Sequence, residues 1–165
     1  MSDLPSSDVT CRSIMATSFP VLHGTMSIAR CVQELLRFRV LAMPVVDGEG
    51  RYLGQFRKNY FISLVLPQVA VHDLRLDRIE RMIETGLLSD TMADVRKRFA
   101  EIAGDPVSRH VDDKAPVLRP EQPMVAAMFC LFHGRNFLPV VDPADGKLLG
   151  VVSAWDVLEN IIKQG

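Results

Sequence analysis

A serine and an aspartate one helical turn apart are the residues of this sequence whose types and spacing best suit ligand chemistry. Ser153 and Asp156 lie in the run GVVSAWD (150–156), where an apolar strand pattern gives way to a helical one. A hydroxyl and free backbone N–H groups at the start of a helix can meet a phosphate. An ionised carboxylate one turn on is a pure acceptor, and it can take two hydrogen bonds from the hydroxyls of a ribose.

The same spacing also suits a purely structural role. Ser-x-x-Asp before an apolar helix is the pattern of a capping box, in which Ser153 would be the N-cap residue. The two roles are compatible, so the sequence leaves both open.

An earlier run carries different chemistry at the equivalent positions. In GQFRKNY (54–60), Arg57 stands where the hydroxyl belongs and Tyr60 stands where the aspartate belongs. A carboxylate that could hold a ribose is therefore missing there, and this first site is either empty or binds something else. Arg57 and Lys58 could instead lend positive charge to a phosphate held by the second run, or they are solvated surface cations.

These two runs belong to a repeat that extends over much of the chain. MPVVD (43–47) returns as LPVVD (138–142), and PVL (20–22) returns as PVL (116–118), with an offset of 95 or 96 residues. The repeat is too long for a solenoid unit and has only two copies. It predicts two small α/β units packed on each other, with a ligand cleft between them.

Each copy is predicted to run strand, helix, strand, turn, strand, helix. Apolar residues at i, i+3, i+4 and i+7 indicate an amphipathic helix in each copy, and Pro123 suits the first turn of the second one. Gly-Glu-Gly (48–50) and Pro-Ala-Asp-Gly (143–146) are turn sequences that predict a hairpin in each copy. The helices are expected over 27–38, 58–65, 124–132 and 154–163.

Residues 67–104 form an insert between the copies. Its apolar periodicity predicts helices near 76–83 and 92–102, followed by Gly86 and Gly104, with Ser89, Asp90 or Thr91 as the cap of the second. We expect ordered helices packed on the rest of the chain, which either cover its surface or present a face to a partner.

Composition excludes several classes of function. The 165 residues carry a formal net charge of -1 with no run of Lys or Arg, which offers no footprint for nucleic acid. No apolar run reaches the roughly 18 residues of a membrane-spanning helix. The three cysteines are widely spaced, which favours a reducing, cytoplasmic setting over a disulfide framework or a thiolate metal site. The four histidines are scattered and show no metal-ligand spacing.

The order of these motifs resembles a tandem pair of cystathionine-β-synthase (CBS) domains, known as a Bateman module. The matching marks in each copy are the amphipathic helix, Pro-Val-Val-Asp, the hairpin and the final glycine-containing run, with Ile14-Met15 before the first strand. The resemblance covers 9–66 and 105–163 and leaves the insert outside. It implies an α/β (α+β) fold of two βαββα repeats related by pseudo-twofold symmetry. Modules of this family are usually regulatory rather than catalytic, and they often pair into a homodimer.

The resemblance also implies a nucleotide site between the copies. Ser153 and Asp156 would hold the phosphate and the ribose of AMP, ADP or ATP, and Arg57 and Arg135 are further phosphate candidates. Arg135 is otherwise an ordinary cation at a helix end. The resemblance also implies a pocket for the base, formed by Ala115, Pro116, Phe137, Pro139 and Val151. All five residues would equally suit an ordinary core strand.

Two functions of different classes follow. The first is a stand-alone regulatory module that senses an adenine nucleotide and signals to a regulated protein which the sequence does not identify. The second is a dimerisation or interaction module of the same fold that has lost its ligand. No enzyme is expected, because no acid, base and nucleophile are grouped in the sequence and no cofactor or metal motif occurs.

Overall fold

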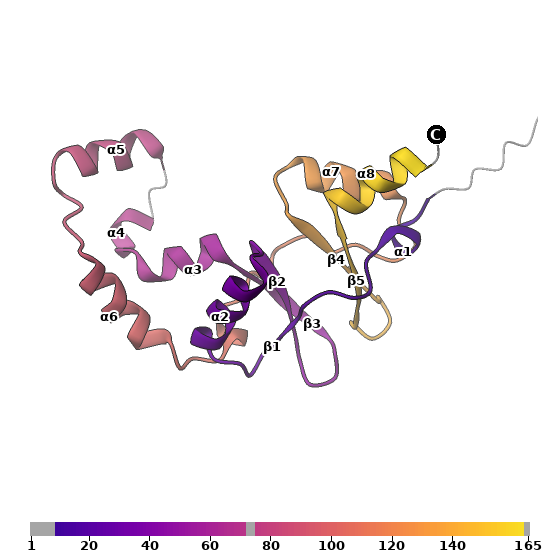
Figure 1. Ribbon diagram of the computed structural model, residues 1–165, viewed down its shortest axis with the longest axis horizontal. Coiled ribbons are helices and arrows are strands. Elements are labelled where there is room, and N and C mark those ends of the chain that lie inside the picture. Colours follow the sequence, from indigo (N-terminus) through magenta and orange to yellow (C-terminus); the bar gives the residue numbers. More distant parts are fainter. Residues whose placement is uncertain (1–8, 72–74, 164–165) are drawn as a thin grey trace, which may run out of the picture.

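The computed structural model describes residues 9–71 and 75–163, which form two similar units and a helical arm (Figure 1). Copy one contains α1 (Cys11–Ile14), β1 (Leu22–His23), α2 (Ile28–Phe38), β2 (Ala42–Val46), β3 (Tyr52–Arg57) and α3 (Lys58–Val65). The insert contains α4 (Gln68–Val71), α5 (Leu76–Glu84) and α6 (Met92–Ile102). Copy two contains the 3₁₀ helix η1 (Val107–Arg109), α7 (Met124–Phe132), β4 (Phe137–Val141), β5 (Leu148–Ser153) and α8 (Ala154–Lys163).

The sheets have the predicted hairpins, and the α+β class is confirmed. In copy one β1 runs parallel to β2, which pairs antiparallel with β3, while β4 pairs antiparallel with β5 in copy two. The first strand expected in copy two is reduced to one parallel bridge between Leu118 and Val140, equivalent to the pairing of Leu22 with Val45.

Local sequence sets the helix starts. The Ser27 side chain caps α2 by accepting a hydrogen bond from the Arg30 N–H at 3.3 Å. Pro123 takes the equivalent place in α7, as the N-cap residue rather than within the first turn, and it makes no side-chain cap.

The segment that leads into each copy pairs with the last strand of the other copy. Ala16 exchanges backbone hydrogen bonds with Val151 on β5 at 2.8 and 3.0 Å, and Asp112 does the same with Gln55 on β3 at 2.8 and 3.1 Å. Residues 16 and 112 are equivalent in the repeat, as are 55 and 151. The two crossings are therefore related by the pseudo-twofold symmetry of the copies.

Each hydrophobic core also contains residues from the segment that leads into the other copy. Cys11 and Ile14 of α1 pack among residues of copy two, with Leu138, Val140 and Val152. Val107 of η1 packs in turn among residues of copy one. Each copy is thus completed by the leading turn of the other.

The insert only partly follows its prediction. A capping box at Thr91 starts α6, and the Phe99 ring on α6 packs edge-on against Phe61 of α3, with ring centroids 5.8 Å apart. The Arg98 side chain also donates a hydrogen bond to the Val65 carbonyl of α3 at 3.0 Å. Neither helix has a buried residue, but α5 in addition has no residue packed against either hydrophobic core, and it lies at the far end of the arm (Figure 1). We expected both helices to pack on the rest of the chain, and only α6 does so, because the apolar stripe of α5 meets few partners.

Among the described residues, no helix combines the length and hydrophobicity that crossing a bilayer requires.

Candidate functional site

The junction of β5 and α8 forms a complete capping box. The backbone N–H and the hydroxyl of Ser153 both donate to Asp156 Oδ2 at 2.7 Å, and the Asp156 N–H lies 3.4 Å from Ser153 Oγ. The structural reading of this motif is therefore realised. Both bonds use the same carboxylate oxygen, and Oδ1 accepts no hydrogen bond from the described residues.

An almost identical box exists in the insert. There the backbone N–H and the hydroxyl of Thr91 donate to Asp94 Oδ2 at 2.8 and 2.7 Å. These bonds hold the pKa of Asp94 below its usual value. Since the sequence gives no ligand role to α6, the geometry of a box does not by itself distinguish a cap from a binding site.

The position of the β5–α8 junction in the fold does distinguish it from the box in the insert. Gly150 lies beneath the segment leading into copy one, and a Cβ placed there would come within 2.8 Å of the Ala16 carbonyl and 2.7 Å of the Met15 sulfur. Residues of copy one thus approach the strand that ends at Ser153. Sequence reasoning missed Met15 and Ala16 as neighbours of this motif, although the glycine repeated at 54 and 150 marks both crossings.

The expected base-pocket residues fall into two groups. Phe137 and Pro139 on β4 pair with Ser153 and Val151 on β5, so this ladder places four predicted residues together. Pro139 is fully buried, and Val151 is nearly so. Ala115 and Pro116 instead follow the segment 111–114, which lines a pocket of copy one.

The equivalent junction in copy one is held by ion pairs instead of a cap. Arg57 is the N-cap residue of α3 but makes no side-chain cap. Its Nη1 donates to Asp112 Oδ2 at 3.4 Å, and Nη1 of Arg135 lies 3.8 Å from the same oxygen. The sequence grouped Arg135 with Ser153. The structure places it at the same Asp112 oxygen as Arg57.

Two pockets adjoin Arg57. One of about 660 Å³ lies between α3 and the segment leading into copy two, and a smaller one of about 210 Å³ reaches Gly134 and Asn136 of copy two. Arg57 and Asn59 line both. None of the five pockets characterised in the described part of the chain is lined by Ser153 or Asp156. The larger pocket is lined by Arg57, Asn59, Tyr60, Ser63, Val71, Val111, Asp112, Asp113 and Lys114.

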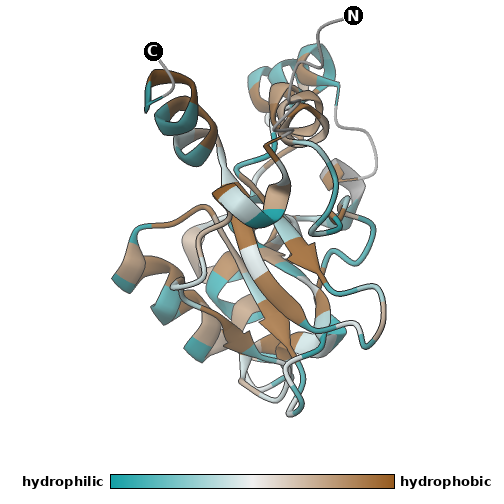
Figure 2. Cartoon of the chain, turned by 90° about the vertical axis from the view of Figure 1, so that its right-hand side faces the viewer, coloured by the Kyte–Doolittle hydropathy of each residue, from teal (hydrophilic) through white to brown (hydrophobic). Residues whose placement is uncertain are grey.

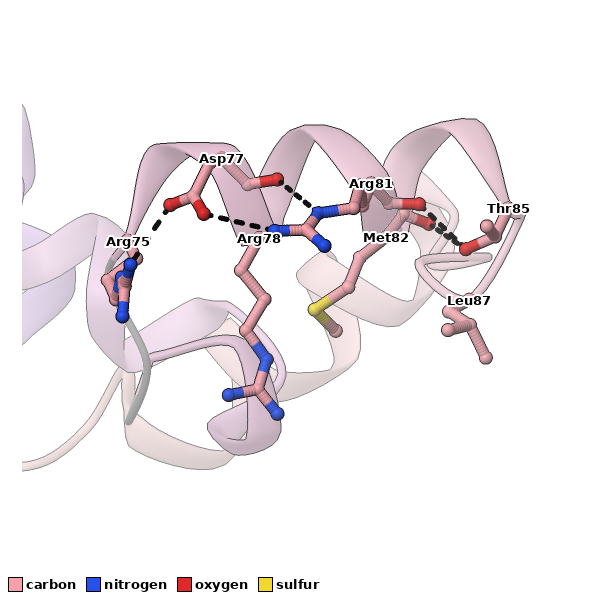
Figure 3. Close-up of a pocket in the computed structure, with 7 residues that line it drawn as sticks. All are labelled: Arg75, Asp77, Arg78, Arg81, Met82, Thr85 and Leu87. Carbon is pink, nitrogen blue, oxygen red and sulfur yellow. Dashed lines mark hydrogen bonds and ion pairs between the residues drawn. The ribbon is translucent and has the colours of Figure 1, made fainter.

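A further hollow of about 440 Å³ lies on the arm, away from both motifs (Figure 3). Three arginines of α5 and its approach line it, but Asp77 pairs with Arg81 at 3.1 Å and with Arg75 at 3.7 Å. Its cationic character is thus partly neutralised within the helix.

The buried thiols have no catalytic character. Burial raises the pKa of Cys31 to about 11 and also raises that of Cys11. These thiols stay protonated at neutral pH and act as small hydrophobic residues. In the described residues, no three histidine, cysteine or acidic side chains are arranged to hold a metal ion.

Comparison with known families explains the repeat. The model of the CBS domain matches residues 11–66 and again residues 107–163. The chain belongs to the CBS domain family. It is a tandem CBS pair, or Bateman module, with a helical insert between the two domains.

Solved CBS proteins share this fold over nearly the whole chain. The CBS-pair protein CBSX2 of Arabidopsis thaliana matches with a TM-score of 0.70 and 19% identity, over 96% of this chain and 97% of that chain. A structure of CBSX2 in complex with AMP matches with a TM-score of 0.65 and 19% identity, over 94% and 98%. CbpB in complex with c-di-AMP matches with a TM-score of 0.66 and 14% identity, over 94% and 86%. Comparison with curated proteins gave no match.

Proposed function

We propose that this CBS pair is a regulatory module that binds an adenine nucleotide between its copies and passes its occupancy to a partner protein. AMP, ADP or ATP would act as a regulatory ligand rather than as a cofactor in a reaction. The observation that carries the proposal is the β5–α8 junction, where one carboxylate oxygen of Asp156 has no hydrogen-bond partner among the described residues and lies beside the start of a helix. The CBS pair CBSX2 forms a complex with AMP, which supports the choice of ligand.

In this proposal the phosphate lies near Ser153 and the N–H groups of the first turn of α8, where the helix dipole favours an anion. Asp156 Oδ1 accepts a hydrogen bond from the ribose while Oδ2 keeps the cap. Phe137 would contribute the apolar wall against the base, with the buried Pro139 and Val151 packed behind it.

A thermal-shift comparison of AMP, ADP, ATP and c-di-AMP tests the proposal. A ligand at 100 times its dissociation constant adds about 2.7 kcal/mol to the free energy of unfolding, which gives a clear rise in the midpoint. Stabilisation by one of these nucleotides at sub-millimolar concentration is expected. No shift with any of them at millimolar concentration would leave the second candidate.

The second candidate is a ligand-free dimerisation or interaction module. It is favoured by the apolar surface of the helices α7 and α8 in copy two, where Phe132 is 85% exposed and Trp155 is 75% exposed. Figure 2 shows hydrophobic residues along the helix that leads to the C-terminus. Copy one also has Arg57 and Tyr60 at the positions of Ser153 and Asp156 in copy two. This difference favours a module that has lost its ligand.

A further inference from the structure

The insert and α3 form an apolar pocket of about 470 Å³, called here the insert pocket. Seven of its ten lining residues are apolar, and they come from α3, α4, α5 and the turns beside these helices. Figure 1 shows α4 between α3 and α5 in the arm. On the two walls, Ile62 of α3 is 48% exposed and Ile83 of α5 is 63% exposed. No side chain of the described residues fills the space between them.

The polar residues of the insert pocket distinguish it from the equivalent face of copy two. Asn59 and Ser63 line the pocket and lie four residues apart, so they share one side of α3. The repeat places Trp155 and Glu159 at these positions in α8. No pocket characterised in the described part of the chain is lined by a residue of α8. The insert pocket is therefore a product of the insert, which lies outside both CBS matches.

The polar groups of the pocket suit an uncharged ligand. The Ser63 hydroxyl donates to the Tyr60 carbonyl at 2.6 Å, which leaves its oxygen as an acceptor. The exposed Asn59 amide offers both donors and an acceptor. Asp90 is the one charged residue in the described lining, and it pairs with Arg98 at 2.5 Å. Because its charge is compensated, a charged ligand would lose hydration in an apolar site without gaining a partner.

The size of the pocket suits a small molecule better than a peptide. Its volume of about 470 Å³ lies within the range of small-molecule sites. A single turn of an α-helix with its side chains already occupies roughly 400–600 Å³. The pocket would therefore receive about one turn of a partner helix, which is far less contact than a stable protein interface provides.

We propose that the insert pocket binds a neutral, largely apolar small molecule that carries one hydrogen-bonding group, such as an amine N–H or a hydroxyl. The apolar body would lie between Ile62 and Ile83, and the polar group would meet Ser63 and Asn59. Such a ligand would supply the apolar contacts that α5 does not obtain from either hydrophobic core. This site is separate from the nucleotide site at Asp156 and does not depend on it.

Fluorescence titration of the full chain with N-phenyl-1-naphthylamine tests the site. This probe is neutral, has one N–H donor, and fluoresces more strongly in apolar surroundings. We expect saturable binding of one probe per chain in this pocket, with a dissociation constant of roughly 10–200 µM. Ile83→Glu should weaken this binding by about tenfold or more, because it places a carboxylate against the apolar probe. Leu76→Glu is the matched control on α5, since Leu76 is 76% exposed and does not line the pocket; it should change the affinity by less than about twofold.

Variants on α3 test the opposite wall. Ile62→Glu should weaken probe binding as much as Ile83→Glu does. Ser63→Ala should weaken it by roughly fivefold, as expected for the loss of one hydrogen bond. Circular dichroism is recorded for each variant, and Ile83→Gln, which should also weaken binding, replaces Ile83→Glu if the latter loses helical content.

The controls on copy two separate this site from other surfaces. Phe132→Glu and Asp156→Ala should both leave probe binding intact. Equal affinities of Ile83→Glu and Leu76→Glu would overturn the inference, as would uptake of the probe without saturation or an unchanged affinity in Ser63→Ala. Loss of binding with Phe132→Glu would place the probe on the α7–α8 face and overturn it too. None of these outcomes bears on the nucleotide proposal, which is tested with nucleotides.

Discussion

Asp156 caps α8 through a single oxygen that accepts both the backbone N–H and the hydroxyl of Ser153 at 2.7 Å. The cap fixes the carboxylate at the helix start and leaves Oδ1 for an external donor. A residue held in this way needs no rearrangement to bind a ligand, which favours a site that also has a structural role.

Asp156→Ala should weaken adenine-nucleotide binding by roughly ten- to a hundredfold. A hydrogen bond to a charged group contributes about 1.5–3 kcal/mol, and each 1.4 kcal/mol is a factor of ten in the dissociation constant. Isothermal titration calorimetry with the nucleotide that gives the largest thermal shift measures the effect.

The insert provides the matched control for this variant. Asp94→Ala breaks the equivalent capping box on α6, so it should lower stability through the lost cap and leave affinity unchanged. Tyr60→Ala should also leave affinity nearly unchanged. Equal losses of affinity in Asp94→Ala and Asp156→Ala would show that the effect is global destabilisation and not the loss of a ligand contact.

Gly54→Ala should destabilise the chain by about 2–4 kcal/mol, which combines backbone strain with overpacking. Gly54 has φ +147°, and an added Cβ would lie 2.9 Å from the Asp112 carbonyl and from Val111 Cβ. Both contacts are to the segment that crosses from copy two. Urea unfolding measures the loss.

Gly48→Ala serves as the control for that substitution. Nothing lies within 4 Å of its added Cβ, so the change in free energy of unfolding should stay within about 0.5 kcal/mol. If Gly54→Ala were as stable as Gly48→Ala, the close approach of the two segments would not exist in solution.

Local patterns in the sequence predicted much of the fold. The bounds of α3, α6 and α8 follow from apolar periodicity and from caps such as Thr91, all of which act over one or two turns. The crossing of Ala16 onto Val151 could not be predicted in this way, because it joins residues far apart through a short irregular segment. The sequence grouped Arg57 and Arg135 as phosphate candidates, but the ion pairs that both make with Asp112 depend on that crossing and were missed for the same reason.

Hydrogen exchange should distinguish the two long helices of the insert. Amides in the second half of α6 are expected to exchange slowly, because Phe99 and Ile102 pack against the core of copy one. Amides of α5 should exchange much faster, because no residue of that helix packs against either hydrophobic core. Exchange measured by mass spectrometry on peptides from 76–84 and 95–102 makes the comparison. Similar protection in both peptides would mean that α5 is covered in solution by a surface that one chain does not provide.

The last prediction concerns assembly. The α7–α8 face of copy two is strongly apolar, with Phe129, Phe132, Trp155 and Ile162 all more than two-thirds exposed. Four large apolar side chains exposed on two neighbouring helices are unusual for a monomer, and closed twofold pairing is the commonest way to bury them. We expect light scattering at tens of micromolar to give twice the chain mass of 18.4 kDa. Phe132→Glu and Trp155→Glu should each shift the mass towards the monomer without lowering helical content, since neither side chain is part of the core.

Leu76→Glu is the control for these variants, because Leu76 is 76% exposed but lies on the arm, away from α7 and α8. The Leu76→Glu chain should remain dimeric. A wild-type chain that scatters as a monomer under these conditions would remove the homodimer and leave the α7–α8 face for a different protein.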